Sequence, residues 1–133
     1  MNLRLTIAML AITSVSVAAD QKYAPLPEKL IKAQTAYLQN DTGEQKLTDN
    51  MFTNLERWGR WRVVTSRSDA DIVISLDHKN GFRNNFFMRV LDRESGETLW
   101  TGKRDVAIGT MNGVTKALLD DLKKRLPPRP STK

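Results

Sequence analysis

The order of apolar patterns along the chain limits its fold more than any other feature. Apolar residues alternate over 30–39 as they do in a strand, and over 44–58 they recur every three or four positions as in an amphipathic helix. Alternation then returns in later segments, before a helical pattern ends the series. The predicted elements are a strand at 30–39, a helix at 44–58, strands at 60–66, 71–77, 83–92 and 98–106, and a helix at 111–126.

This order predicts an α+β fold. A strand, a helix and a second strand indicate a parallel pair joined by a right-handed crossover, and the later strands indicate an antiparallel meander. Leu47, Met51, Leu55 and Trp58 form one apolar stripe on the first helix, and Phe52 widens it. The sequence therefore predicts a two-layer sandwich of order β-α-β-β-β-β-α, in which two helices cover one face of a five-stranded mixed sheet.

The segment "LERWGRWRVV", residues 55–64, joins the first helix to the second strand. Its tryptophans and arginines fit either a cluster that recognises a ligand or nucleic acid, or a simple joint. Periodicity favours the joint, because Trp58 completes the helical stripe, Gly59 suits a left-handed helix end and Trp61 begins the buried side of a strand. The arginines are then expected in solvent: Arg57, Arg60 and Arg62.

The N-terminus has the pattern of a secretory signal peptide. Arg4 is followed by an apolar stretch and then by small residues, and the stretch is shorter than the roughly 20 residues that a membrane-spanning helix needs. We expect cleavage after Ala18 or Ala19. The predicted division is a signal peptide at 1–19, an extended leader at 20–29, a single domain at 30–126 and a disordered tail at 127–133.

The amino-acid composition excludes several kinds of functional site. The chain contains no cysteine, which excludes disulfides, thiolate metal sites and a lipid-bearing cysteine after the signal peptide. An exported protein without disulfides is held together by packing alone, which favours the bacterial periplasm over the extracellular medium as its location. The formal net charge of +6 is spread without a basic run. A basic surface that binds an anionic polymer or nucleic acid is the alternative function, and "GFRNNFFMRV" has the mixed aromatic and basic character of RNA-binding strands.

The sequence predicts no catalytic, cofactor-binding or metal residue. His78 is the only histidine, and Asp69 with Asp71 lacks the further ligands of a calcium loop, so Asp71 is interpreted as a strand-start cap. A small hydrolase that uses Asp77 and His78 is a third hypothesis. Two other carboxylate pairs fall in a predicted turn and on a predicted helix surface: Glu94 with Glu97, and Asp120 with Asp121.

Four segments carry a resemblance: "AQTAYLQND", "LERWGRWRVV", "SDADIVISL" and "VLDRESGETLW". Over residues 33–126 the chain resembles small signal-bearing bacterial proteins of unknown function. Its architecture is similar to the N-terminal domain of the Tol-Pal translocation protein and to the lipoprotein activators of peptidoglycan synthases. The resemblance implies an exported, non-catalytic binding or assembly module of the cell envelope, periplasmic or secreted, and no catalytic residue is carried over.

Several predicted strands are apolar on both sides, whereas two helices can cover only one face of a sheet. We therefore expect the other face to bind a second copy or an envelope protein, with Phe87, Leu91 and Leu99 as anchors. In the alternative, the leader covers this face within one molecule through Tyr23, Leu26 and Pro27.

Overall fold

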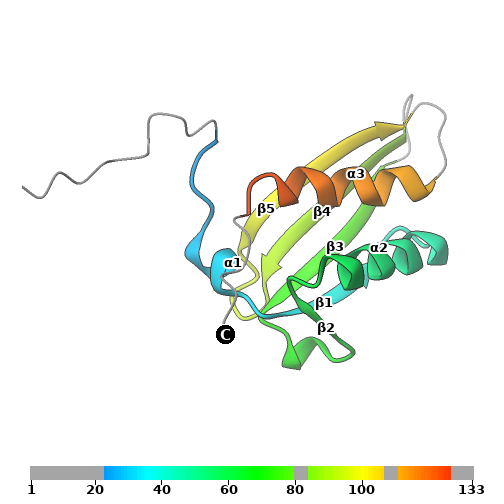
Figure 1. Cartoon of the computed structure of the whole chain (residues 1–133). Coiled ribbons are helices and arrows are strands. Elements are labelled where there is room, and N and C mark those ends of the chain that lie inside the picture. Colours follow the sequence, from blue (N-terminus) through cyan, green and yellow to red (C-terminus); the bar gives the residue numbers. More distant parts are fainter. Residues whose placement is uncertain (1–22, 80–83, 107–110, 127–133) are drawn as a thin grey trace, which may run out of the picture.

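Five strands form one mixed sheet with the spatial order β2-β1-β3-β4-β5 (Figure 1). The computed structural model describes residues 23–79, 84–106 and 111–126. β1 is parallel to β2, and β3, β4 and β5 form an antiparallel meander, as predicted. β1 is also parallel to β3 and lies between β2 and β3, a strand order that the sequence did not predict. The strands are β1 (Thr35–Asn40), β2 (Arg62–Val64), β3 (Ile72–Lys79), β4 (Asn84–Asp92) and β5 (Thr98–Val106).

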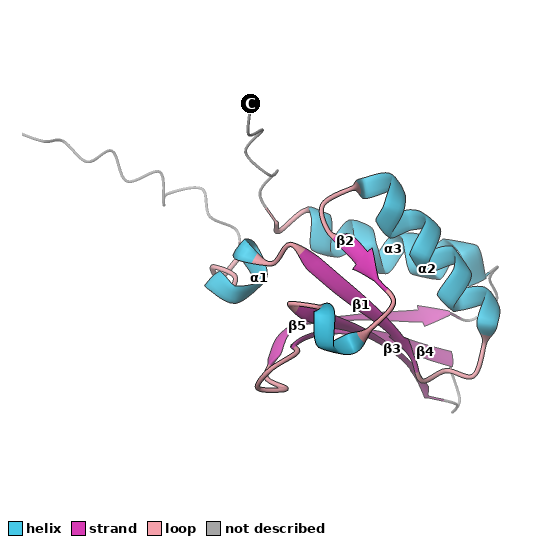
Figure 2. Ribbon diagram, turned by 90° about the horizontal axis from the view of Figure 1, so that it is seen from below, coloured by secondary structure: helices cyan, strands magenta, loops and turns pink. Residues whose placement is uncertain are grey.

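Both long helices lie on the same side of the sheet (Figure 2). These are α2 (Gln45–Trp58) and α3 (Met111–Lys123). Three residues of the predicted stripe of α2 are buried, and the fourth, Trp58, is partly buried against the core. Phe52 is 46% exposed, so the expectation that it widens the stripe was wrong. The core between the helices and the sheet includes Leu47, Met51, Leu55, Leu118, Leu122, Ile72, Ile74, Leu76, Met88 and Val90.

The joint after α2 has the predicted form. Gly59 has φ +68° and its N–H donates to the carbonyl of Leu55, which ends the helix in the left-handed conformation. The rings of Trp58 and Trp61 meet edge to face, with 5.0 Å between their centroids, and Trp61 is buried in the core. Both tryptophans therefore serve packing.

Arg60 corrects one expectation about this joint. Arg57 and Arg62 are exposed as predicted, but Arg60 is only 6% exposed and its Nη2 donates to the carbonyl oxygen of Ile31. The guanidinium thus ties the start of β2 to the segment before β1. Sequence periodicity gave no sign of this contact, because the acceptor is a backbone atom.

A short helix, α1 (Glu28–Lys32), replaces the end of the predicted leader and the start of the predicted first strand. Pro27 precedes it, and the Pro27 carbonyl accepts from the N–H groups of Leu30 and Ile31. Leu30 is fully buried, so α1 closes one end of the core, and the strand begins only at Thr35. Residues 20–22 of the leader lie outside the described residues, as do the signal peptide and the tail.

The hairpin between β4 and β5 turns at Gly96, whose φ of +75° confirms its predicted position. A register shift between Val90 and Leu91 interrupts the pairing of these two strands. Within the described residues, no helix is long and apolar enough to cross a membrane.

Candidate interaction surface

The sheet has one face that neither of the long helices α2 and α3 covers, and we call it the open face (Figure 2). Alternate strand residues point to it, away from α2 and α3. The 3-10 turn η2 (Arg67–Asp69) lies against β1 on this side of the sheet, where Arg67 Nη1 donates to Gln39 Oε1 over 2.9 Å and the Asp69 carbonyl accepts from Thr35 Oγ1 over 3.2 Å. The open face includes Val64, Tyr37, Gln39, Val73, Ser75, Asp77, Lys79, Asn85, Phe87, Arg89, Leu91, Thr101, Lys103 and Asp105.

An apolar row crosses one end of the open face. Val64, Tyr37, Val73 and Leu91 are neighbours on β2, β1, β3 and β4, because each is paired with the next in the strand register. Val73 at the centre is fully buried, although it lies outside the core beneath the helices. The three flanking side chains are half-buried. This row therefore offers a shallow apolar surface with a well-packed centre.

Two charged rows cross the other end. In the first, Asp77 on β3, Phe87 on β4 and Lys103 on β5 are directly opposite one another. The ammonium groups of Lys79 and Lys103 lie 5.8 and 5.9 Å from the centroid of the Phe87 ring, within the range of a cation–π contact. The aromatic side chain is thus held between two cations.

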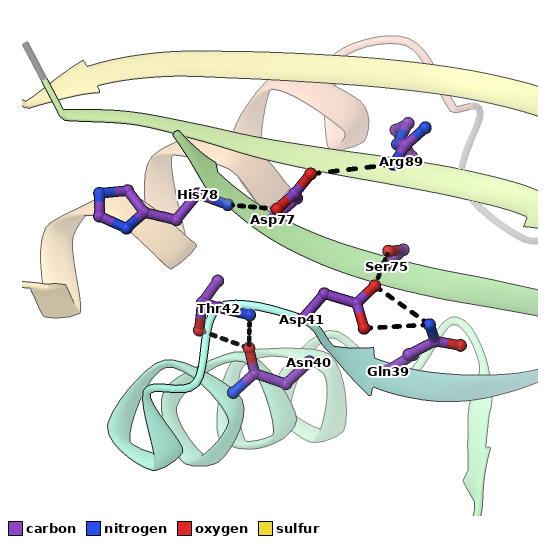
Figure 3. Close-up of polar contacts among 8 residues, drawn as sticks. All are labelled: Gln39, Asn40, Asp41, Thr42, Ser75, Asp77, His78 and Arg89. Carbon is purple, nitrogen blue, oxygen red and sulfur yellow. Dashed lines mark hydrogen bonds and ion pairs between the residues drawn. The ribbon is translucent and has the colours of Figure 1, made fainter. Parts of the chain in front are cut away.

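Polar side chains of β1, β3 and β4, with Asp41 just after β1, form a cluster on this side of the sheet (Figure 3). Gln39 Nε2 donates to the Asp41 oxygens Oδ1 and Oδ2 at 3.2 and 3.0 Å, and Ser75 Oγ donates to Oδ2 at 3.2 Å. Arg89 Nη2 lies 3.9 Å from Asp77 Oδ2. These contacts link β1, β3 and β4 across the surface and fix the positions of their polar side chains.

Two of the three predicted anchors lie on the open face. Phe87 and Leu91 are half-buried there, as alternation along β4 predicted. Leu99 is 5% exposed and belongs to the core, so its prediction as an anchor was wrong. The register shift pairs Val90 with Trp100 and Leu91 with Thr98, which leaves Leu99 without a direct partner and breaks the alternation.

The described part of the leader does not cover the open face. Leu26 packs against the core, and Tyr23 is 48% exposed. Arg125, just after α3, donates from Nη2 to the carbonyl of Ala24, and its guanidinium lies 5.4 Å from the Tyr23 ring centroid. The leader from residue 23 onward therefore contacts the helical layer, and this alternative fails for those residues.

The carboxylate of Asp71, in the "SDAD" segment, has a structural role. Asp71 Oδ2 accepts from the backbone N–H groups of Gln34 at 2.9 Å and Thr35 at 3.2 Å. The Asp71 N–H donates to Thr35 Oγ1 at 2.9 Å. Asp71 is therefore a cap, as predicted, but the strand end that it caps is the start of β1.

Asp77 and His78 lie on opposite faces of the sheet. The His78 ring stacks on Phe86 with 4.4 Å between centroids and points away from the Asp77 carboxylate (Figure 3). The pair therefore does not have the geometry of an acid–base pair that could act on one substrate. Phe86 is 5% exposed beneath the helices, so it is not available to stack on a nucleic-acid base; Phe82 and Arg83 lie outside the described residues.

The other carboxylate pairs are in the turn and on the helix, as expected. Glu94 and Glu97 are exposed in the β4–β5 hairpin. Asp121 accepts from Arg104 Nη2 at 2.6 Å and from Arg104 Nε at 3.0 Å, which ties α3 to β5. Within the described residues, no group of three or more histidine, aspartate and glutamate side chains is placed to hold a metal ion.

A polar groove of about 490 Å³ lies beside α1, and the sequence gave no sign of it because α1 was not predicted. Lys29 Nζ is 3.3 Å from Asp92 Oδ2 at this groove. Hydrogen bonds from the Ser95 hydroxyl and backbone N–H, with the Lys29 ammonium, lower the pKa of Asp92 below its ordinary value of 3.8. The groove is lined by Glu28, Lys29, Lys32, Ala33, Asp71, Asp92, Arg93 and Glu94.

Solved structures place this fold among known proteins. TolB from Acinetobacter baumannii superposes with a TM-score of 0.57 at 15% identity, over 81% of this chain and 31% of TolB. The chain thus spans about a third of TolB, and the similarity in architecture to the Tol-Pal translocation protein is confirmed at the level of the fold. No protein-family model matches the sequence, and neither does any curated protein.

Two further structures align with lower TM-scores. PelC from Paraburkholderia phytofirmans, solved as a dodecamer, gives 0.47 at 16% identity over 80% of this chain and 96% of PelC. The C-terminal domain of LpoB from Escherichia coli gives 0.46 at 17% identity over 57% of this chain and 84% of that domain.

Proposed function

We propose that this chain is an exported, non-catalytic binding or assembly module of the bacterial cell envelope, and that it holds another folded protein against its open face. The signal-peptide pattern of residues 1–19 supports export to the periplasm or beyond. The fold that the chain shares with TolB is consistent with such a location. The division of the sheet into one covered and one open face supports a binding function.

The observation that carries the proposal is the arrangement of Phe87 and Leu91 on the open face. Both are half-buried apolar side chains on one strand. Leu91 belongs to the apolar row, and Phe87 is flanked by the charged residues Asp77 and Lys103. Protein interfaces commonly combine a few apolar or aromatic anchors at the centre with a polar rim. The partner is therefore expected to present apolar side chains to these anchors and charged side chains to their surroundings.

The chemistry of the described residues supports a non-catalytic module. Asp71 and Asp92 accept hydrogen bonds that hold strand and turn ends, and Asp121 is paired with Arg104. Asp77 and His78 diverge on opposite faces. These groups therefore serve the fold rather than a reaction centre.

The test is crosslinking in the native host, followed by mass spectrometry of the products. The wild-type protein is compared with Phe87→Ser and with the matched control Phe52→Ser, because Phe52 is an exposed phenylalanine on the helical side. The proposal predicts a defined crosslinked protein that is recovered with wild type and Phe52→Ser but lost with Phe87→Ser. Equal recovery with all three proteins would contradict it.

Export is tested separately, because it rests only on the N-terminal sequence. The purified protein from host cells is expected to begin at Ala19 or Asp20. Recovery of an intact Met1 from the soluble fraction of the cell would reject export while leaving the open face as a possible binding surface.

A further inference from the structure

We propose that the occupant of the open face is a second copy of this chain, stacked face to face about a twofold axis that runs along β4. The proposal rests on the binding surface assigned above and names its partner. It is drawn from the charge pattern on the two strands that flank β4, which is self-complementary in this arrangement.

The first charged row has opposite signs on either side of Phe87. Phe87 is paired with Asp77 on the neighbouring strand β3 and with Lys103 on the other neighbouring strand, β5. A twofold axis along β4 exchanges the positions of β3 and β5 between the two copies. Asp77 then faces the partner's Lys103, and Lys103 faces the partner's Asp77.

The next row repeats this pattern with the signs reversed. Lys79 on β3 is paired with Asn85 on β4, and Asn85 is paired with Asp105 on β5. The same axis places Lys79 opposite the partner's Asp105. The row between the apolar row and the first charged row has neutral flanks, Ser75 and Thr101. One symmetry operation therefore matches each unlike charge pair without opposing like charges on the flanking strands.

The residues on the axis itself come from β4. Phe87 and Leu91 meet the same residues of the partner and form the apolar centre of the interface. Arg89 is the one charged residue on the axis, and its guanidinium lies 3.9 Å from Asp77 of its own chain. That anion offsets part of the repulsion between the two Arg89 side chains. The fourth open-face residue of β4, Asn85, places an uncharged amide on the axis.

The β5 edge of the sheet is poorly suited to a different kind of self-association, in which two sheets pair edge to edge. β5 is an edge strand, and its exposed residues near the hairpin-distal end are charged: Lys103, Arg104 and Asp105. Charged side chains on an edge strand oppose edge-to-edge pairing of sheets. Arg104 is also bound to Asp121 of α3. Stacking through the open face is therefore favoured over extension of the sheet through β5.

The test uses charge reversal in two separate chains, with the association measured by sedimentation equilibrium. Asp77→Lys alone places lysine against the partner's Lys103, and Lys103→Asp alone places aspartate against the partner's Asp77. Each variant is expected to dimerise about tenfold more weakly than wild type or worse, because two like-charge contacts form in each dimer. A one-to-one mixture of the two variants restores opposite charges at both contacts and is expected to form a heterodimer.

Matched controls reverse charges on the helical side. Glu56→Lys and Lys46→Asp change exposed residues of α2 and are expected to leave dimerisation unchanged. Circular dichroism and thermal unfolding check that all four variants are folded. Salt is expected to weaken the wild-type dimer, since exposed charge pairs are screened.

Three outcomes would overturn the proposal: a wild-type chain that stays monomeric at millimolar concentration, single reversals that dimerise as wild type does, or a mixture that fails to restore the dimer. A monomeric chain that still crosslinks to a different envelope protein through Phe87 would overturn this inference alone. A dimer that is insensitive to reversals on the open face, with crosslinking that is insensitive to Phe87→Ser, would remove the proposed surface as well.

Discussion

The indole ring of Trp100 lies over Gly102, two residues further along β5, and occupies the space that a side chain at position 102 would need. Both residues are buried beneath the helical layer. A Cβ atom at position 102 would collide with the ring, so Gly102→Ala should displace Trp100 from the core. We expect a loss of about 1–3 kcal/mol in the free energy of unfolding, the usual range for overpacking. Urea denaturation monitored by tryptophan fluorescence measures it, and an unchanged midpoint would contradict this packing.

Alanine substitutions at two other glycines are expected to change the stability of the protein in opposite directions. Gly59 has φ +68°, so Gly59→Ala should lower the free energy of unfolding by about 1–2 kcal/mol. Gly113 lies within α3, is exposed and has no atom near the position of a Cβ. Gly113→Ala should therefore raise stability by about 0.5–1 kcal/mol. Thermal unfolding of both variants checks the two signs, and a shift in the same direction for both would contradict the assigned helix end or the assigned helix.

The cap formed by Asp71 gives a third prediction. Removal of its carboxylate in Asp71→Ala leaves the N–H groups of Gln34 and Thr35 without their acceptor, which should cost about 1–2 kcal/mol of stability. Asp69→Ala is the matched control, because that exposed carboxylate lies two residues away, and it should change stability by less than about 0.5 kcal/mol. Chemical denaturation compares the two, and equal losses would show that Asp71 has no special role.

The lowered pKa of Asp92 leads to a prediction of how the free energy of unfolding depends on pH. The pKa of Asp92 is lowered in the folded chain, chiefly by the Ser95 hydroxyl, so the folded state favours the carboxylate more than the unfolded state does. Its stabilising contribution is complete above the ordinary pKa of 3.8 and is lost as the pH falls through the lower folded-state pKa. The stability difference between wild type and Asp92→Asn should therefore shrink below about pH 4. Denaturation curves from pH 6 to pH 2 measure this, and a constant difference would refute it.

Features that depend on nearby residues could be predicted from the sequence. The stripe of α2, the left-handed end at Gly59 and the turn at Gly96 follow from local periodicity and backbone freedom, and the structure has all three. Alternation along β4 likewise placed Phe87 and Leu91 on the face opposite the helices. These positions need no knowledge of the partner strand.

Features set by distant contacts could not be predicted in this way. Leu99 is turned into the core by a register shift that depends on how β4 and β5 pair. Arg60 is buried because a carbonyl 29 positions earlier in the chain accepts its hydrogen bond. The match between Asp77 and Lys103 also requires the strand order and register, which alternation within one strand does not determine.

The central claim is that a second copy of this chain occupies the open face, and site-specific crosslinking in intact host cells tests it most directly. The chain has no cysteine, so Asn85→Cys and the control Phe52→Cys each introduce a single reactive thiol. Asn85 lies on the proposed twofold axis two residues before Phe87, so the anchor itself stays intact. With a short bismaleimide reagent, the account predicts a crosslinked species at twice the mass of the chain for Asn85→Cys and none for Phe52→Cys. Equal crosslinking at both positions, or no crosslinked species at position 85, would contradict it.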